Sequence, residues 1–124
     1  MQVQFLHQMF LHHVWVKEFY SIFLRFVMNI TITSRHFKAS PELHDLATKA
    51  AHHFEKIYSS IKRTEIILDD EHEKVVEFIV HVNHHILSSK DHSYNFEQSI
   101  HAASDKMIAQ LRKLKEKQSD SRKE

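Results

Sequence analysis

The chain has 124 residues, with 17 Lys and Arg, 16 Asp and Glu and 13 His, so its formal net charge is +1. This length falls in the usual range of about 100 to 200 residues per domain, which predicts one domain and excludes a second catalytic one. The chain has no Cys and no Gly. This excludes disulfides, thiolate chemistry, glycine-rich phosphate loops and strained nucleophile elbows.

Residues 1–27 differ from the rest in composition, because they hold more than half of the aromatic residues and few formal charges. They have neither the basic start nor the small-residue cleavage site of a signal peptide. His7, Lys17 and Arg25 are among the residues that argue against a membrane span. The segment is either an added amphipathic helix or an upstream stretch translated from an early start codon. We favour the second interpretation, with Met28 as the native start and residues 1–27 outside the fold.

A strand and a helix are predicted in the first part of the remaining chain. Ile30 and Ile32 alternate with polar residues up to about Ser34, which is typical of a half-buried strand. After a loop over residues 35–40, Ser40, Pro41 and Glu42 provide a hydroxyl N-cap, a proline in the first turn and an acid near the positive end of the helix dipole. The apolar residues that follow at spacings of three and four are Leu43, Leu46, Ala47, Ala50, Phe54, Ile57 and Tyr58.

Three strands and a second helix complete the pattern. Alternation predicts strands over residues 64–69, 75–82 and about 85–90, with an acidic hairpin connection at 69–73 and with Leu87 and Ser89 inward. The second helix begins at Asn95, with Gln98 as its capping-box partner, and continues to about Lys117. The tail, residues 118–124, is polar and is predicted to be frayed. The buried stripe of this helix consists of Phe96, Ile100, Ala103, Met107, Leu111 and Leu114.

The predicted fold is α+β, in the order β-α-β-β-β-α, with a four-stranded mixed sheet and two helices packed on one face. The crossover through the first helix makes the first two strands parallel neighbours, and the two hairpins make the later pairs antiparallel. The opposite face of the sheet is then open. On it we expect Glu65, Ile67, Asp69, Glu77, Ile79 and His81.

Residues 28 to about 117 carry a family resemblance. The opening "MNITITSRHF" is one of its two most specific pieces. The other is the final-helix pattern formed by Ile100, Asp105, Lys106, Gln110, Leu111 and Lys113. Over these residues the chain resembles the hibernation-promoting factors of bacterial ribosomes, also called the ribosome-associated inhibitor A family. The resemblance implies that residues 28–117 form a ribosome-binding domain.

The resemblance implies a cytoplasmic, non-enzymatic protein with no cofactor and no small-molecule substrate. It implies binding to the small ribosomal subunit and its 16S rRNA, in the channel used by messenger RNA and transfer RNA, which inhibits translation and preserves idle ribosomes. The chain stops seven residues past Lys117, so it resembles the short form of the family, which lacks the dimerising domain. We expect a monomer off the ribosome and no membrane association.

The final helix provides the predicted RNA-binding residues. Lys106, Gln110, Lys113 and Lys117 are spaced i, i+4, i+7 and i+11 on one helix face, with Arg112 beside them. Such a stripe can follow phosphates, whose counterions are released on binding. The alternative is a solvated helix end with cations placed favourably against the C-terminal dipole. Spacing leaves both open, and the family resemblance favours RNA.

The first helix departs from the family at His44, Ala50 and His53, where relatives often place Lys or Arg. Neutral imidazole carries no charge for a phosphate near pH 7.5, whereas its cation does. Lys49 and Lys56 are predicted to substitute from neighbouring turns. The alternative is that His44 and His53 are simple exposed helix positions.

Metal binding and catalysis are not predicted. The adjacent pairs His52–His53 and His84–His85 point different ways in any regular element, and no His-Glu-x-x-His spacing exists. The acidic stretch at 69–73 is interpreted as a solvated loop rather than a general acid–base site. The competing class of function is a generic protein-interaction module that uses the outer sheet face. A basic helix face opposite an acidic sheet face would favour ribosome binding.

Overall fold

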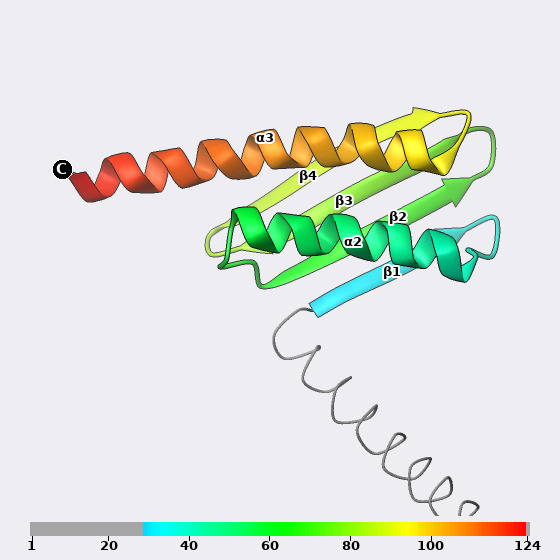
Figure 1. Ribbon diagram of the computed structural model, residues 1–124, viewed down its shortest axis with the longest axis horizontal. Helices are drawn as coiled ribbons and strands as arrows, with labels where there is room; N and C mark the ends of the chain where they lie inside the picture. Colours follow the sequence, from blue (N-terminus) through cyan, green and yellow to red (C-terminus); the bar gives the residue numbers. More distant parts are fainter. Residues whose placement is uncertain (1–28, 124) are drawn as a thin grey trace, which may run out of the picture.

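The computed structural model describes residues 29–123 and follows the predicted order of elements. The expectations for residues 1–27 and for Met28 as the start lie outside these residues. The strands and helices, shown in Figure 1, are β1 (Asn29–Arg35), α2 (Pro41–Ile57), β2 (Arg63–Asp70), β3 (Lys74–Val82), β4 (His85–Ser93) and α3 (Phe96–Lys123).

The four strands form one mixed sheet in the order β1-β2-β3-β4. β1 pairs parallel with β2, and the pairs β2–β3 and β3–β4 are antiparallel, as predicted. Both helices cover the same face of the sheet (Figure 1). The register places Glu65 opposite Ile79 and Ile67 opposite Glu77 on the open face, which confirms the predicted outer surface.

The core lies between the helices and the sheet. Phe54 of α2 and Phe78 of β3 are fully buried, and their rings meet edge to face with centroids 5.1 Å apart. α2 buries a narrower face than predicted, because the fully buried positions are Ala47, Ala51 and Phe54. Ala51 was not among the predicted residues. The flanking residues Leu43, Leu46, Ala50 and Ile57 are only partly buried.

Both predicted N-caps are present. Ser40 Oγ accepts a hydrogen bond from the Leu43 N–H at 3.2 Å, and Asn95 Oδ1 accepts one from the Gln98 N–H at 2.8 Å. The capping box predicted at Asn95 was wrong in one respect, the group that accepts the hydrogen bond from the Asn95 N–H. The Asn95 N–H donates to Ser93 Oγ at 3.3 Å, so the reciprocal partner is a serine that precedes the helix rather than the Gln98 side chain.

α3 extends beyond the predicted end. It continues to Lys123 instead of ending near Lys117, so the segment expected to be a frayed tail is helical. The Gln118 Nε2 donates to the Tyr58 hydroxyl at 2.6 Å, which links the distal part of α3 to the end of α2. β4 also extends past residue 90 to Ser93, because β3 begins at Lys74 and supplies a pairing partner for each added residue. No helix within residues 29–123 is long and apolar enough to cross a membrane.

Candidate functional site

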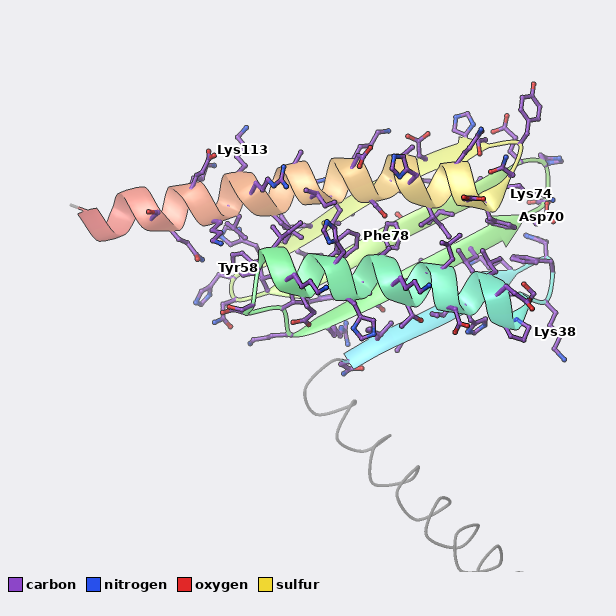
Figure 2. All side chains as sticks on the ribbon, in the orientation of Figure 1. Lys38, Tyr58, Asp70, Lys74, Phe78 and Lys113 are labelled. Atoms are coloured by element: carbon purple, nitrogen blue, oxygen red, sulfur yellow. The ribbon has the colours of Figure 1, made fainter. Side chains whose placement is uncertain are left out.

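The two ends of the sheet differ in the sign of the charge that their side chains carry. We define the acidic end as residues 69–73 of the β2–β3 hairpin together with His36, Lys74 and His92. We define the basic end as Lys56 of α2 with Arg112, Lys113, Lys115 and Lys117 of α3. In Figure 2, Asp70 and Lys74 lie at one end of the molecule, and Lys113 and Tyr58 lie at the other.

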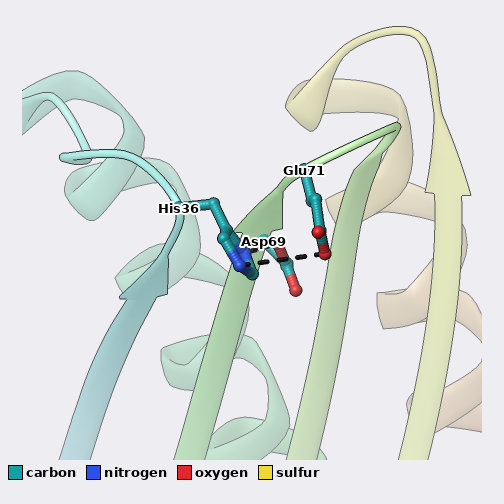
Figure 3. Close-up of side chains that lie close together, drawn as sticks. All are labelled: His36, Asp69 and Glu71. Atoms are coloured by element: carbon teal, nitrogen blue, oxygen red, sulfur yellow. Dashed lines mark hydrogen bonds and ion pairs between the residues drawn. The ribbon is translucent and has the colours of Figure 1, made fainter.

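At the acidic end, His36 lies between two carboxylates. Its Nδ1 is 2.9 Å from Asp69 Oδ1 and its Nε2 is 3.8 Å from Glu71 Oε2 (Figure 3). The hydrogen bond to Asp69, followed by the charge of Glu71, raises the pKa of His36 above its ordinary value. His36 has a φ of 68°, in the left-handed region. The next residue, Phe37, stacks on Phe96 of α3 with ring centroids 5.0 Å apart.

The same three side chains are the candidate metal ligands within residues 29–123. One ligand atom from each lies within 4.8 Å of the others. However, the two ring nitrogens face different carboxylates, whereas a metal ion would take one ring nitrogen and draw both carboxylates to that side. The geometry therefore fits a protonated imidazole held between two acids. Sequence reasoning missed this cluster because His36 and Asp69 are 33 positions apart and meet only through the β1–β2 pairing.

The remaining acidic side chains of the hairpin also have partners. Lys74 Nζ is 2.6 Å from Asp70 Oδ1, and His92 Nδ1 is 2.6 Å from Glu73 Oε2. Lys74 additionally lies over the Phe96 ring, 5.8 Å from its centroid. The loop is exposed to solvent at residues 71–73, as expected, and its acidic side chains also form ion pairs with neighbouring residues.

Two of the predicted RNA-binding residues hold α3 to the edge of the sheet. Lys106 Nζ is 3.0 Å from Asp91 Oδ2 and donates to the Lys90 carbonyl at 3.2 Å. Gln110 Nε2 donates to the Ser88 carbonyl at 2.7 Å. The hydrogen bond from Lys106, with one from the His92 N–H, keeps the pKa of Asp91 below its ordinary value. Lys106 and Gln110 therefore satisfy outward carbonyl groups of the edge strand β4.

The cations nearer the C-terminal end of α3 differ from Lys106, whose ammonium group pairs with Asp91. Arg112, Lys113 and Lys117 are exposed, and none of them forms an ion pair with a residue among 29–119. Lys113 and Lys117 line a hollow beside the start of β4. Lys115 lies on the side of α3 that faces α2, where it lines a second hollow together with Lys56 and Tyr58.

The structure brings together three of the four predicted residues of α2. Lys49, His53 and Lys56 are exposed and follow one another at i, i+4 and i+7 on the outward side of the helix. His44 is also exposed, but at about 100° per residue it lies about 180° around the helix from His53. His44 therefore does not share a surface with the other three.

These observations define a small α+β protein with both helices on one face and an unpaired basic end. The family model described as Sigma 54 modulation protein / S30EA ribosomal protein matches residues 30–119. The chain therefore belongs to this family of ribosome-associated proteins, which confirms the resemblance identified from the sequence.

Solved structures share the fold. A ribosomal subunit interface protein from Coxiella burnetii is 24% identical, with a TM-score of 0.67, and the match covers 71% of this chain and 98% of that one. The N-terminal domain of Protein Y from Thermus thermophilus is 15% identical, with a TM-score of 0.64 and coverage of 70% and 99%. A search of curated proteins finds no match.

Proposed function

We propose that this protein binds the small ribosomal subunit in the channel used by messenger RNA and transfer RNA, where it inhibits translation and preserves idle ribosomes. The observation that carries the proposal is the basic end. Arg112, Lys113 and Lys117 are exposed on a domain of a ribosome-associated family, without an acidic partner among residues 29–119. Exposed, unpaired cations are the groups that gain most by replacing the counterions of RNA phosphates.

The charge distribution also favours one orientation on RNA. The acidic end presents Asp69, Glu71 and Glu73 at the opposite end of the sheet. RNA phosphates repel these carboxylates and attract the basic end, so the approach to a ribosome is oriented before contact. We infer that the interface consists of Lys49, His53 and Lys56 of α2 with Arg112, Lys113 and Lys117 of α3.

The proposal extends to the setting in which the protein acts. It works in the cytoplasm of stressed or stationary-phase cells, contacts 16S rRNA and is monomeric off the ribosome. It uses no cofactor and catalyses no reaction. The Coxiella burnetii protein of the same fold is described as a ribosomal subunit interface protein, which supports the ribosome as the partner.

The competing function is a protein-interaction module that uses the outer sheet face. That face combines Ile86, whose surface is 69% exposed, with the Glu65–His81 pair at 2.7 Å. A partner protein docking there would leave the basic end free. The two functions therefore differ in which residues the association requires.

Fractionation of stationary-phase cells on a sucrose gradient tests the proposal. We expect the protein to co-migrate with small subunits and whole ribosomes, and the variant Lys113→Ala/Lys117→Ala to shift toward the top of the gradient. The matched control is Lys38→Ala/Lys90→Ala, which removes the same charge from exposed positions outside the basic end. Equal behaviour of the two variants, or no co-migration of the wild type, would contradict the proposal.

A further inference from the structure

The basic end contains a hollow that the cations alone do not explain. It has a volume of about 380 Å³ and lies between the distal part of α3 and the start of β4. It is lined by Leu87, which is partly buried, and by Leu114, which is 9% exposed. Its other lining residues are the exposed Lys113, Lys117 and His85, together with Gln110 and Gln118, whose amides are bonded to Ser88 and Tyr58. The hollow thus has an apolar base with an imidazole and two ammonium groups at its margin.

This combination suits one chemical group. A nucleobase has apolar faces that stack on aromatic or imidazole rings, and it is joined to phosphates that attract lysine. The volume is near the lower limit of the about 300 to 1,000 Å³ found for ligand pockets, which fits a small planar group. We propose that this hollow binds an unpaired nucleobase of single-stranded RNA, stacked on His85, with its phosphates on Lys113 and Lys117.

The positive charge at the hollow favours a nucleotide over an apolar peptide or a free lipid tail. None of the residues that line the hollow is acidic, and two of them are lysines. A base inside a duplex is stacked and paired, so it cannot enter without the cost of unpairing. The hollow should therefore distinguish single-stranded from double-stranded RNA. The inference rests on the proposed function, because the ribosome supplies the RNA.

The β3–β4 turn offers a matched pair of variants. His84 and His85 are adjacent and both exposed, but only His85 lines the hollow. His84 has a φ of 66°, a conformation that asparagine tolerates well. His84→Asn and His85→Asn therefore remove the same ring from neighbouring positions, and thermal melting of both variants at the wild-type temperature shows that the fold is intact.

The probe is a short single-stranded RNA that carries the fluorescent base 2-aminopurine, free or annealed to its complement. We expect the wild type to bind the single strand more tightly than the duplex and to change the fluorescence of the base. Loss of one stacking ring should weaken single-strand binding about tenfold in His85→Asn. Binding by His84→Asn should equal that of the wild type.

Equal affinity for single strand and duplex, or equal binding by the two histidine variants, would overturn the nucleobase pocket. Co-migration with ribosomes, measured on the same proteins, separates this failure from that of the proposed function. If the wild type co-migrates but does not prefer single strands, only the pocket is wrong. If it prefers single strands, with His85 required, but does not co-migrate, the pocket stands and the ribosomal function fails.

Discussion

The acidic and basic ends differ in the surroundings of their charged side chains. At the acidic end, Asp69 and Glu71 face His36, and Asp70 faces Lys74. At the basic end, Lys113 and Lys117 have no such partner among residues 29–119. Charges paired within a fold contribute to its own order, whereas unpaired like charges repel one another and favour a partner of opposite sign. The contrast identifies the end that is available for binding.

The largest expected effect is a loss of stability, because both ends of the sheet depend on the same hydrophobic core. Phe78→Ala deletes a fully buried ring that packs on Phe54. We expect a loss of about 3–5 kcal/mol from a total stability of about 5–15 kcal/mol. Thermal denaturation followed by circular dichroism measures this loss. Ile79→Ala on the half-buried outer face is the control and should cost less; equal melting temperatures would show that the inward face is misassigned.

Removing the charges of the basic end should change binding without changing the fold. For Arg112→Ala/Lys113→Ala/Lys117→Ala, we expect the slope of log affinity against log salt to flatten by about two to three units, because each phosphate contact contributes about 0.7–0.9. Binding to purified small subunits at several salt concentrations measures the slope. Lys106→Ala is the internal comparison, since its ammonium group is already engaged by Asp91. An equal change of slope for Lys106→Ala alone and for the triple variant would show that the assignment to the distal helix is wrong.

The contacts of α3 with the edge strand should matter for stability rather than for binding. Gln110→Ala removes the hydrogen bond to the Ser88 carbonyl, which should cost about 1 kcal/mol. Chemical denaturation measures the loss. Gln110 also lines the hollow at the start of β4, but its amide is held by the Ser88 carbonyl, so ribosome association of the folded variant should weaken less than that of Lys113→Ala/Lys117→Ala. A variant of unchanged stability but weakened association would place Gln110 in the RNA interface instead.

The smallest expected effect is a pH dependence of stability that arises from His36 at the acidic end. Because the pKa of His36 is raised above 6.5 in the folded protein, the folded state binds this proton more tightly than the unfolded state. The resulting stabilisation is fully present below about pH 6.5 and is lost as the pH rises through the folded pKa. His36→Asn should therefore destabilise the protein more at pH 6 than at pH 8, measured by thermal melting. His72→Asn in the same hairpin serves as the control, and an identical loss for His36→Asn at both pH values would remove the proposed charge pairing.

The sequence allowed accurate prediction of features that depend on near neighbours. Alternation identified β2 and β3, and the caps at Ser40 and Asn95 were correct because each bond spans three residues. Features that depend on distant partners were missed. α3 extends past Lys117 with a contact to Tyr58, 60 positions away, and no local pattern reports such a contact.

The predicted basic stripe of α3 also shows that a local sequence pattern does not report contacts with distant residues. Lys106, Gln110, Lys113 and Lys117 have equivalent spacing, so the sequence assigned all four to RNA. The edge of β4 lies beneath the first two, and its carbonyl groups accept their hydrogen bonds. Spacing fixes the side of the helix on which a side chain lies, but only the neighbouring strand determines whether that side chain remains available.

The cover that α3 provides over β4 also bears on how the protein behaves when it is abundant. An edge strand with unsatisfied carbonyl groups is a template on which a strand of another molecule can pair, and this is a common route to aggregation. Gln110 and Lys106 occupy the outward carbonyls of Ser88 and Lys90, and the positive charge of Lys106 further discourages an approaching copy of the same edge. By covering this edge, Lys106 and Gln110 protect the protein from edge-to-edge strand pairing at high concentration.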